Sequence, residues 1–201
     1  HIYVDEKADI KKAVPVIVDA KTQYPAACNA VETVLVSRKI ADRVLPELDA
    51  ALQAAGVKVR GDEEVAGYMG CERIAEDEFG TEYSDLTMSV KLVENVEEAV
   101  EHINRYGSHH TDCIITEADG TAEYFMQMVD SAGVYRNCST RFADGFRYGF
   151  GAEVGISTGK LHARGPVGLE GLVTYKYRLS GTGQIVSDYA EGRKQFHHRD
   201  V

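Results

Sequence analysis

Cysteine is scarce in this chain, with four residues among 201, and the four lie far apart. The scarcity excludes a disulfide framework, and the spacing excludes the paired cysteines of a structural zinc site. No apolar run approaches the length that crosses a bilayer, and no secretory leader is visible, although a chain that begins with His1 leaves its native targeting open. We therefore expect a protein of a reducing compartment that does not insert into membranes.

Positive charge is also in short supply, since 22 Lys and Arg face 32 Asp and Glu and give a formal net charge of -10. Phosphate backbones are bound by clustered cations, so this balance argues against a nucleic-acid partner. Several cations do gather between residues 136 and 178, whereas residues 62–101 are acidic. The basic segment fits a small anionic substrate or nucleotide phosphates, and it also fits a solvated face.

Two glycine-rich signatures of nucleotide binding are missing, namely GxGxxG after a strand and GxxxxGK followed by Ser or Thr. No internal repeat or low-complexity tract is present either. Eight glycines do lie between Gly145 and Gly171, which indicates tight turns and close approach of the backbone. The sequence therefore places the cradle of a nucleotide cofactor elsewhere than in this segment.

Hydrophobic periodicity predicts strands that alternate with helices. The predicted helices are 8–22, 40–55, 96–106 and 121–129, and the predicted strands are 31–36, 57–60, 86–93, 112–116 and 133–137. Residues 61–85 show no steady period and are expected to form loops and short turns. This alternation is typical of an α/β fold with a mostly parallel sheet flanked by helices. Residues 172–179 alternate as an extended strand that leaves the globule.

One cysteine stands in a distinctive local sequence, the run Tyr24–Thr33 (YPAACNAVET). Pro25 favours the first turn of a helix, so we expect Cys28 to lie near unpaired N–H groups that stabilise a thiolate. The alternative is that Cys28 packs as an inert core residue, as free cysteines often do. The local sequence therefore suggests a nucleophile at position 28.

The chain resembles the gamma-glutamyl phosphate reductases and the matching half of the bifunctional pyrroline-5-carboxylate synthases, which belong to the aldehyde dehydrogenase superfamily. The resemblance covers roughly residues 1–180. Besides Tyr24–Thr33, it rests on Tyr106–Asp112, Asn137–Phe142 with Asp144-Gly145, Gly149–Val154, Ser157-Thr158 and Leu161–Leu172. These motifs are long and stand in the right order, so chance agreement is an inadequate explanation.

The resemblance implies a reductase that turns gamma-glutamyl phosphate into glutamate 5-semialdehyde and phosphate, with NADPH as cofactor, in proline biosynthesis. The thiol of Cys28 would displace phosphate and form a thioester that accepts hydride. The same resemblance implies an aldehyde-dehydrogenase-like catalytic domain at 1–171 and an extended strand with a tail at 172–201. The domain that binds most of the nucleotide would precede residue 1, so we expect this stretch alone to show no NADPH-dependent turnover.

Glu82 is the expected ligand of the nicotinamide ribose. The superfamily uses a glutamate in an E-x-F-G-P run, which Glu78-Phe79-Gly80 mimics, but counting from Glu82 to the strand at 88–93 gives the offsets without a gap. A loop carboxylate with no ligand is the alternative for Glu82. The expected substrate-binding residues follow a strand end, where α/β sheets build sites; they are Asn137, Ser139, Thr140 and Arg141.

Arg141, with Ser139 and Thr140, is the expected anchor of the substrate carboxylate, unless Arg141 makes a structural ion pair. Asn29 could donate a hydrogen bond to the oxyanion, or it could have a cap or surface role. Cys138 is expected to be buried and inert. Glu153 and Glu170 are expected to brace the backbone. Adjacent histidines at 109–110 and 197–198 lack ligand partners at metal spacing, so no metal is expected.

The expected partners are gamma-glutamyl phosphate, further copies of the chain paired through its C-terminal strand, and a glutamate 5-kinase as a fused domain or a separate protein. The expected location is the cytoplasm, or the mitochondrion if the chain is part of a bifunctional synthase. Two other functions stay open. One is an aldehyde-oxidising member of the superfamily, and the other is a non-catalytic oligomerisation or regulatory module of the same fold.

Overall fold

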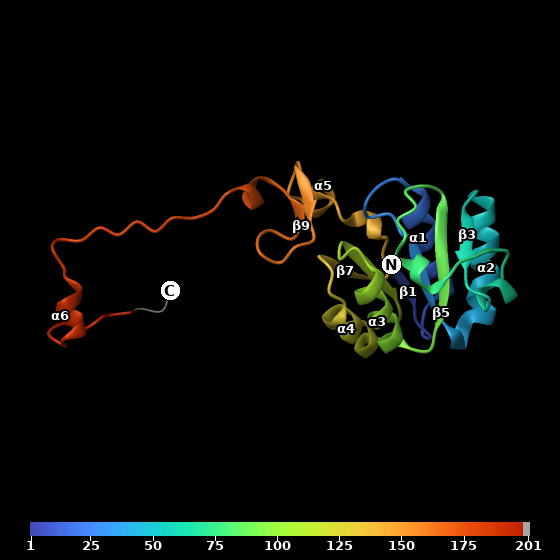
Figure 1. Ribbon diagram of the computed structural model, residues 1–201, viewed down its shortest axis with the longest axis horizontal. Coiled ribbons are helices and arrows are strands. Elements are labelled where there is room, and N and C mark those ends of the chain that lie inside the picture. The colour runs from blue at the N-terminus through green and yellow to red at the C-terminus, as the bar shows by residue number, and fades with distance from the viewer. Residues whose placement is uncertain (199–201) are drawn as a thin grey trace.

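The computed structural model describes residues 1–198 and shows an α/β body with a C-terminal arm (Figure 1). The body contains a seven-stranded sheet in which every neighbouring pair is parallel, with the strand order β4-β3-β5-β2-β1-β6-β7. The strands are β1 (Ile2–Val4), β2 (Thr33–Ser37), β3 (Lys58–Gly61), β4 (Glu72–Arg73), β5 (Thr87–Val93), β6 (Thr111–Ile115) and β7 (Gly133–Arg136). The predicted parallel α/β architecture is confirmed.

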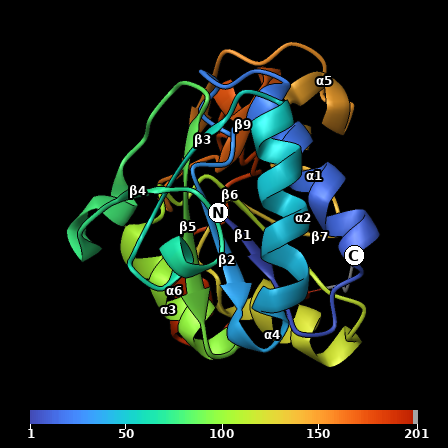
Figure 2. The same ribbon diagram turned by 90° about the vertical axis from the view of Figure 1, so that its right-hand side faces the viewer.

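Four main helices cover the two faces of this sheet. They are α1 (Ile10–Thr22), α2 (Ala41–Ala54), α3 (Val96–Tyr106) and α4 (Asp119–Met128). Figure 2 shows α1 and α2 together on one side. All four were predicted to within a few residues from their hydrophobic periodicity. Two of them also have side-chain caps, since Asp9 accepts from Lys11 N at the start of α1 and Asn95 accepts from Glu98 N at the start of α3.

The central strands are buried on both faces, so they read as continuous apolar runs rather than as an alternating pattern. Alternate residues of β1 still separate two cores. Ile2 and Val4 pack in the cluster that includes α1 and α2, whereas Tyr3 packs in the cluster that includes α3 and α4. Helices on both faces of the sheet therefore hold its edges, and the loops there, in fixed positions.

The end of α2 illustrates how the local sequence sets a boundary. Gly56 has a φ of 72°, which is left-handed backbone that glycine adopts without a Cβ penalty. The N–H of Gly56 donates to Gln53 O, and that of Val57 donates to Leu52 O, so the last carbonyls of the helix are satisfied. The chain then turns directly into β3.

The segment 61–85 is irregular, as predicted, with the short helices η2 (Val65–Gly67) and η3 (Glu76–Gly80). The two-residue strand β4 within it was not predicted, because two residues carry no periodicity. After β7 come the short helices η4 (Thr140–Phe142) and α5 (Gly145–Tyr148). An antiparallel ribbon of β8 (Gly155–Ser157) and β9 (Gly165–Val167) follows, and then η5 (Leu169–Leu172).

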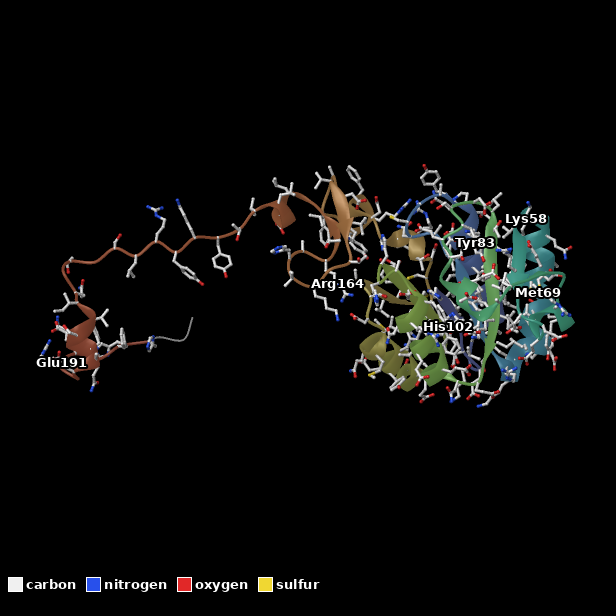
Figure 3. All side chains as sticks on the ribbon, viewed as in Figure 1. Lys58, Met69, Tyr83, His102, Arg164 and Glu191 are labelled. Atoms are coloured by element: carbon white, nitrogen blue, oxygen red, sulfur yellow. The ribbon has the colours of Figure 1, made fainter. Side chains whose placement is uncertain are left out.

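The ribbon is tied to the body at its base, where Figure 3 labels Arg164. Arg164 Nη2 donates to the backbone oxygen of Asp130 at 3.1 Å and to its carboxylate at 3.0 Å. Lys160 forms a second ion pair with the same aspartate at 2.6 Å. Two cations on one carboxylate fix the ribbon to the chain that precedes β7.

Beyond η5 the chain runs away from the body (Figure 1), and up to residue 198 its one regular element is α6 (Val186–Ala190). Residues 173–185 are not paired as a strand, and Tyr177 and Leu179 are 90% and 100% exposed. The predicted C-terminal strand is not assigned within these residues, and its pairing with a second copy stays a prediction. So does the domain boundary at residue 172. Residues 199–201 of the predicted tail lie outside the described residues.

Across the described part of the chain, no helix has the length and hydrophobicity needed to cross a bilayer.

Candidate active site

Cys28 lies in a cleft at the amino edge of the parallel sheet. Since the strands are parallel, the loops that enter β1, β2, β5 and β6 meet at this edge, and the cleft of about 220 Å³ is built from them. Its lining residues are His1, Cys28, Ala30, Glu32, Thr33, Phe79, Gly80, Thr81, Glu82, Tyr106, Gly107, Ser108 and Thr111. The tertiary fold thus brings Cys28 and Glu82, the two residues for which we predicted chemistry, to the wall of one cleft.

The helix that we expected to begin at Pro25 is absent. Helix α1 ends at Thr22, and the chain makes two successive turns in which Ala27 N donates to Tyr24 O and Ala30 N donates to Ala27 O. The N–H of Val31 then donates to Ala20 O, which lies in the last turn of α1. The connection between α1 and β2 is too short for another helix, so Cys28 occupies a turn and no helix dipole stabilises its thiolate.

The group that lies beside the Cys28 thiol is the side chain of His110, not the N-terminus of a helix. The Sγ atom of Cys28 lies 3.3 Å from His110 Nε2, and the other ring nitrogen, Nδ1, lies 2.8 Å from Thr111 Oγ1. His110 is only 4% exposed and immediately precedes β6, which fixes its ring orientation. A thiol and an imidazole at this separation can exchange a proton.

The local electrostatics favour the neutral forms of both groups. Cys28 is exposed as a residue, but its sulfur faces the cleft, where loss of solvent raises the pKa of the thiol and the charges of Glu82 and Glu153 raise it further. The backbone N–H of Cys28 and the charge of Arg141 act in the opposite direction. Burial lowers the pKa of His110. The resting pair is therefore thiol and neutral imidazole, not the preformed thiolate that we expected.

The loop that carries Glu82 is fastened to the segment after Cys28. Glu32, four residues beyond the cysteine, accepts from Ser84 N at 3.4 Å, and its backbone oxygen accepts from Ser89 N at 2.8 Å. The other carboxylate oxygen of Glu32 pairs at 2.8 Å with Lys21, whose side chain is fully buried. Glu32 thus links α1, the Cys28 segment and the 82–84 loop.

Glu78, the residue that mimics the superfamily register, is engaged elsewhere. Its carboxylate accepts from Ala75 N at 2.7 Å at the start of η3 and lies 3.7 Å from Arg60. Glu78 does not line the cleft, whereas Glu82 does and is exposed to it. The geometry supports Glu82 as the candidate ribose ligand.

A second, smaller cavity of about 140 Å³ contains two of the predicted substrate-binding residues. Its lining residues are Asp19, Gln23, Ser139, Arg141, Phe142 and Arg147. Arg141 donates through Nε to Gln23 Oε1 at 2.8 Å and lies 5.9 Å from the ring centroid of Tyr24. Within residues 1–198 Arg141 forms no ion pair with a carboxylate, so the structural ion pair that we considered is not found.

Ser139 and Thr140 position their neighbours. Ser139 Oγ accepts from Arg141 N at 3.3 Å and caps η4. Thr140 is 1% exposed and donates to Asn29 O at 2.7 Å, while Asn29 donates through Nδ2 to Ala143 O at 2.7 Å. Asn29 is therefore neither a cap nor a surface residue. These bonds fasten η4 and the residue that follows it to Asn29, the residue after Cys28.

Asn137 is the predicted site residue that the structure separates from the others. Its side-chain oxygen accepts from Thr116 N at 2.9 Å and its amide nitrogen donates to Thr116 O at 3.0 Å. Asn137 thus stays at the carboxyl edge, after the strand end where we expected the substrate-binding residues. The other three do not stay there, because residues 140–143 run back along α1 to the opposite edge of the sheet.

His110 is the residue that sequence reasoning missed. It was considered only as half of a His-His metal pair, although it lies in the Tyr106–Asp112 motif. No spacing rule pairs positions 28 and 110, because they meet only through the parallel pairing of β1 with β2 and with β6. Residues 1–198 hold no cluster of three or more side chains suited to a metal ion, and the absence of a metal stays a prediction.

Other predicted residues have simpler roles. Glu153 accepts from Gly145 N at 2.9 Å, as expected of a residue that braces the backbone. Glu170 lies exposed in η5 and makes no such bond within the described residues. Cys138 is half-buried, and burial raises the pKa of its thiol, which fits an unreactive cysteine.

The full chain is similar to curated cyanobacterial proteins. It is 60% identical over 202 residues to Gamma-glutamyl phosphate reductase 1 of Synechocystis sp. and covers 47% of that protein. It is also 60% identical over 201 residues to the Gamma-glutamyl phosphate reductase of a Synechococcus species and covers 46% of it. The chain therefore spans about half the length of the curated relatives it matches. No family model matches the chain.

Solved structures agree with the sequence relatives. The crystal structure of Gamma-glutamyl phosphate reductase from Thermotoga maritima superposes with a TM-score of 0.89 at 50% identity, over 92% of this chain and 45% of that one. An acetylating aldehyde dehydrogenase from Geobacillus thermoglucosidasius superposes with a TM-score of 0.61 at 19% identity, over 90% of this chain and 51% of that one. The second match shows that the fold is aldehyde-dehydrogenase-like.

Proposed function

Because this chain belongs to the gamma-glutamyl phosphate reductase family, we propose that it is the catalytic portion of an NADPH-dependent reductase that converts gamma-glutamyl phosphate to glutamate 5-semialdehyde and phosphate. The reaction is a step of proline biosynthesis. One observation carries the proposal: Cys28 Sγ lies 3.3 Å from His110 Nε2, in the cleft that Glu82 also lines. The pair supplies a nucleophile and its base in one place.

In the first half-reaction His110 activates the thiol. In the tautomer that carries its proton on Nδ1, the ring donates to Thr111 Oγ1, and the lone pair of Nε2 is free to take the thiol proton. The thiolate attacks the acyl carbon of gamma-glutamyl phosphate, a carbon–sulfur bond forms, and the carbon–oxygen bond to phosphate breaks with its electron pair leaving on phosphate. The product is a thioester on Cys28. Phosphate is a good leaving group, so no hydrolytic base is required.

The cleft also fits the cofactor half of the reaction, because Glu82 lines it together with the thiol that must face the reactive carbon. A bound nicotinamide supplies the hydride that reduces the thioester carbonyl. In this chain Cys28 would hold the acyl group, and the exposed Glu82 carboxylate would accept hydrogen bonds from the ribose hydroxyls of the bound nucleotide. The ion pair between Lys21 and Glu32 helps to hold the Cys28 segment and the loop that carries Glu82 in fixed relative positions. We propose that a domain upstream of residue 1 binds most of the nucleotide.

Substrate binding is assigned to the smaller cavity. The guanidinium of Arg141 offers its two terminal nitrogens to the α-carboxylate, since only Nε is used, by Gln23. Ser139 and Thr140 hold the backbone that carries Arg141. Asn137 acts at a distance by fixing the start of this segment on Thr116. A direct contact between Asn137 and substrate would have to displace these bonds.

The arm is assigned to assembly. Residues 173–179 are extended and alternate Val173, Tyr175 and Tyr177, all more than half exposed, with polar residues, which suits strand addition to a second copy. We propose that the protein is a homo-oligomer assembled through this segment. A glutamate 5-kinase, as a fused domain or a separate protein, would supply the acyl phosphate. The location we propose is the cytoplasm, or the mitochondrion for a bifunctional enzyme.

The proposal is tested by trapping the acyl-enzyme of the full-length protein. The enzyme is mixed with freshly generated gamma-glutamyl phosphate without nucleotide, quenched in acid, digested and analysed by mass spectrometry. A glutamyl adduct is expected on the peptide that contains Cys28, and Cys28→Ala should abolish both the adduct and turnover. Cys138→Ala is the matched control and should retain both. An unmodified Cys28 in an enzyme that turns over would contradict the proposal.

The two other readings give different results in the same preparation. A non-catalytic module would show neither an adduct nor turnover, and its Cys28 would react with iodoacetamide at the rate of an ordinary thiol. An aldehyde-oxidising enzyme would release glutamate from the thioester by hydrolysis and would not need phosphate in the reverse direction. The proposed reductase should oxidise glutamate 5-semialdehyde only when phosphate is present.

A further inference from the structure

The smaller cavity contains charged groups of both signs that form no ion pair among the described residues. Arg141 and Arg147 form no ion pair there, and the Asp19 carboxylate, exposed near the end of α1, makes neither an ion pair nor a hydrogen bond within residues 1–198. Free charges at a protein surface are common, but here two cations and one anion share the wall of one cavity of about 140 Å³. The wall therefore complements a small zwitterion.

The two arginines are held side by side by their local structure. Arg147 Nη1 donates to the backbone oxygen of Arg141 at 2.7 Å, and Arg147 N donates to Asp144 Oδ2 at 3.0 Å. Burial lowers the pKa of Arg141, and the charge of Arg147 lowers it further. An anion placed between the two guanidinium groups would relieve this repulsion, and a carboxylate has the two oxygens needed to bind both.

The cavity is also correctly placed relative to the nucleophile. Thr140 donates to Asn29 O at 2.7 Å, and Asn29 donates to Ala143 O at 2.7 Å. The segment that carries Arg141 is therefore bonded on both sides to the residue that follows Cys28. A glutamyl group whose acyl carbon meets Cys28 has its α-carbon a few bonds away, on the side of this cavity.

We propose that Arg147, with Arg141, binds the α-carboxylate of the substrate and that Asp19 binds its α-ammonium group. The inference rests on the proposed function and extends it, because it makes the site selective for an α-amino acid rather than for any acyl phosphate or aldehyde. Asp19 and Arg147 are specificity-determining residues and take no part in bond making. Their loss should act on substrates that carry the matching charge and on no others.

The test uses the full-length enzyme in the reverse direction, with phosphate, NADP⁺ and three aldehydes. Glutamate 5-semialdehyde carries both charges, 5-oxopentanoate lacks the ammonium group, and 4-aminobutanal lacks the carboxylate. Asp19→Asn should lower kcat/KM about 10- to 100-fold for glutamate 5-semialdehyde, mainly through KM, and leave 5-oxopentanoate within about twofold. Arg147→Gln should do the same for glutamate 5-semialdehyde and leave 4-aminobutanal within about twofold.

Each outcome has a distinct meaning. Equal losses on all three aldehydes, or no loss on any, would overturn the assignment of Asp19 and Arg147. Asp19→Glu, which keeps the charge, should recover part of the activity if the ammonium contact is correct. A wild-type enzyme without phosphate-dependent turnover of glutamate 5-semialdehyde would contradict the proposed function itself, whatever the variants do.

Discussion

Several polar side chains at the two edges of the parallel sheet differ in how fully they are hydrogen-bonded. At the carboxyl edge, Asp5 accepts from Tyr3 and from Thr116, and Thr116 is bound in turn by Asn137. At the amino edge, Cys28 and Glu82 face an open cleft, and within the described residues the thiol has only His110 as a side-chain partner. The contrast indicates that the carboxyl edge mainly stabilises the fold, whereas the amino edge is available for chemistry.

Ligand sites in open α/β sheets usually lie outside the carboxyl ends of the strands. Here the loops that enter the strands are the ones that carry Cys28, Glu82 and His110, so the proposed site lies at the edge opposite to the one that this rule indicates. A polar side chain is available for chemistry where its loop does not engage it in hydrogen bonds with the rest of the fold. The comparison yields three predictions, which are ordered from the largest expected effect to the smallest.

The largest effect is expected at the amino edge, from His110→Gln in the full-length enzyme. Glutamine keeps the approximate size of histidine but accepts no proton, so kcat should fall about 10²- to 10⁴-fold. In the wild type, His110 must be neutral to act as the base. Its pKa is lowered by burial, so activity should fall with decreasing pH only below the usual histidine range.

The pH profile of the variant separates catalysis from structure. In His110→Gln the acidic limb should disappear, and the rate should instead rise with pH as the Cys28 thiol ionises, above the usual thiol range because its pKa is raised. Alkylation of Cys28 by iodoacetamide, followed against pH, measures the same ionisation. A variant that keeps the wild-type profile would remove His110 from the mechanism.

A smaller effect, on stability, is expected from Lys21→Met. Lys21 is fully buried and pairs with Glu32 at 2.8 Å, so the substitution leaves a largely buried carboxylate without its cation. Since Glu32 keeps some access to water, we expect a loss of about 2–3 kcal/mol in the free energy of unfolding, measured by urea denaturation. The double variant Lys21→Met with Glu32→Gln should recover part of it. An unchanged free energy of unfolding in the single variant would show that the ion pair makes no net contribution to stability.

The smallest effect is expected at the carboxyl edge, from Thr116→Val. Thr116 is fully buried, donates to Asp5 at 2.7 Å and accepts from Ala118 N at 3.0 Å. Loss of the hydroxyl should lower the free energy of unfolding by about 1–2 kcal/mol, with kcat and KM within about twofold of the wild type. A marked fall in kcat with little change in stability would contradict the division between the two edges.

Much of the fold could be read from the chain. The central strands are runs of apolar residues, and the helices carry their own signals, such as Asp9 and Asn95 at the start and Gly56 past the end. Strand β4 could not be read, because its two residues exist as a strand only through their pairing with Arg60 and Gly61. The order of the seven strands could not be predicted either, because it depends on pairing between segments that are far apart in the chain.

The candidate site was predictable only in part. The local sequence and the family resemblance singled out Cys28 and Glu82, and the structure places both on one cleft. The expected helix at Pro25 was wrong, because a signal for a helix start also suits a tight turn, and the distance back to β2 decides between them. The partner of the thiol, His110, carries no local signal of its role.

By itself, the sequence determined the alternation of strands and helices and singled out Cys28 as the candidate nucleophile, because both depend on residues that are close together in the chain. The tertiary structure decided which edge of the sheet holds the candidate site, which histidine lies beside the thiol and which charges line the smaller cavity. Those relations join residues as distant as 28 and 110. Only the parallel pairing of buried strands brings such residues within bonding distance.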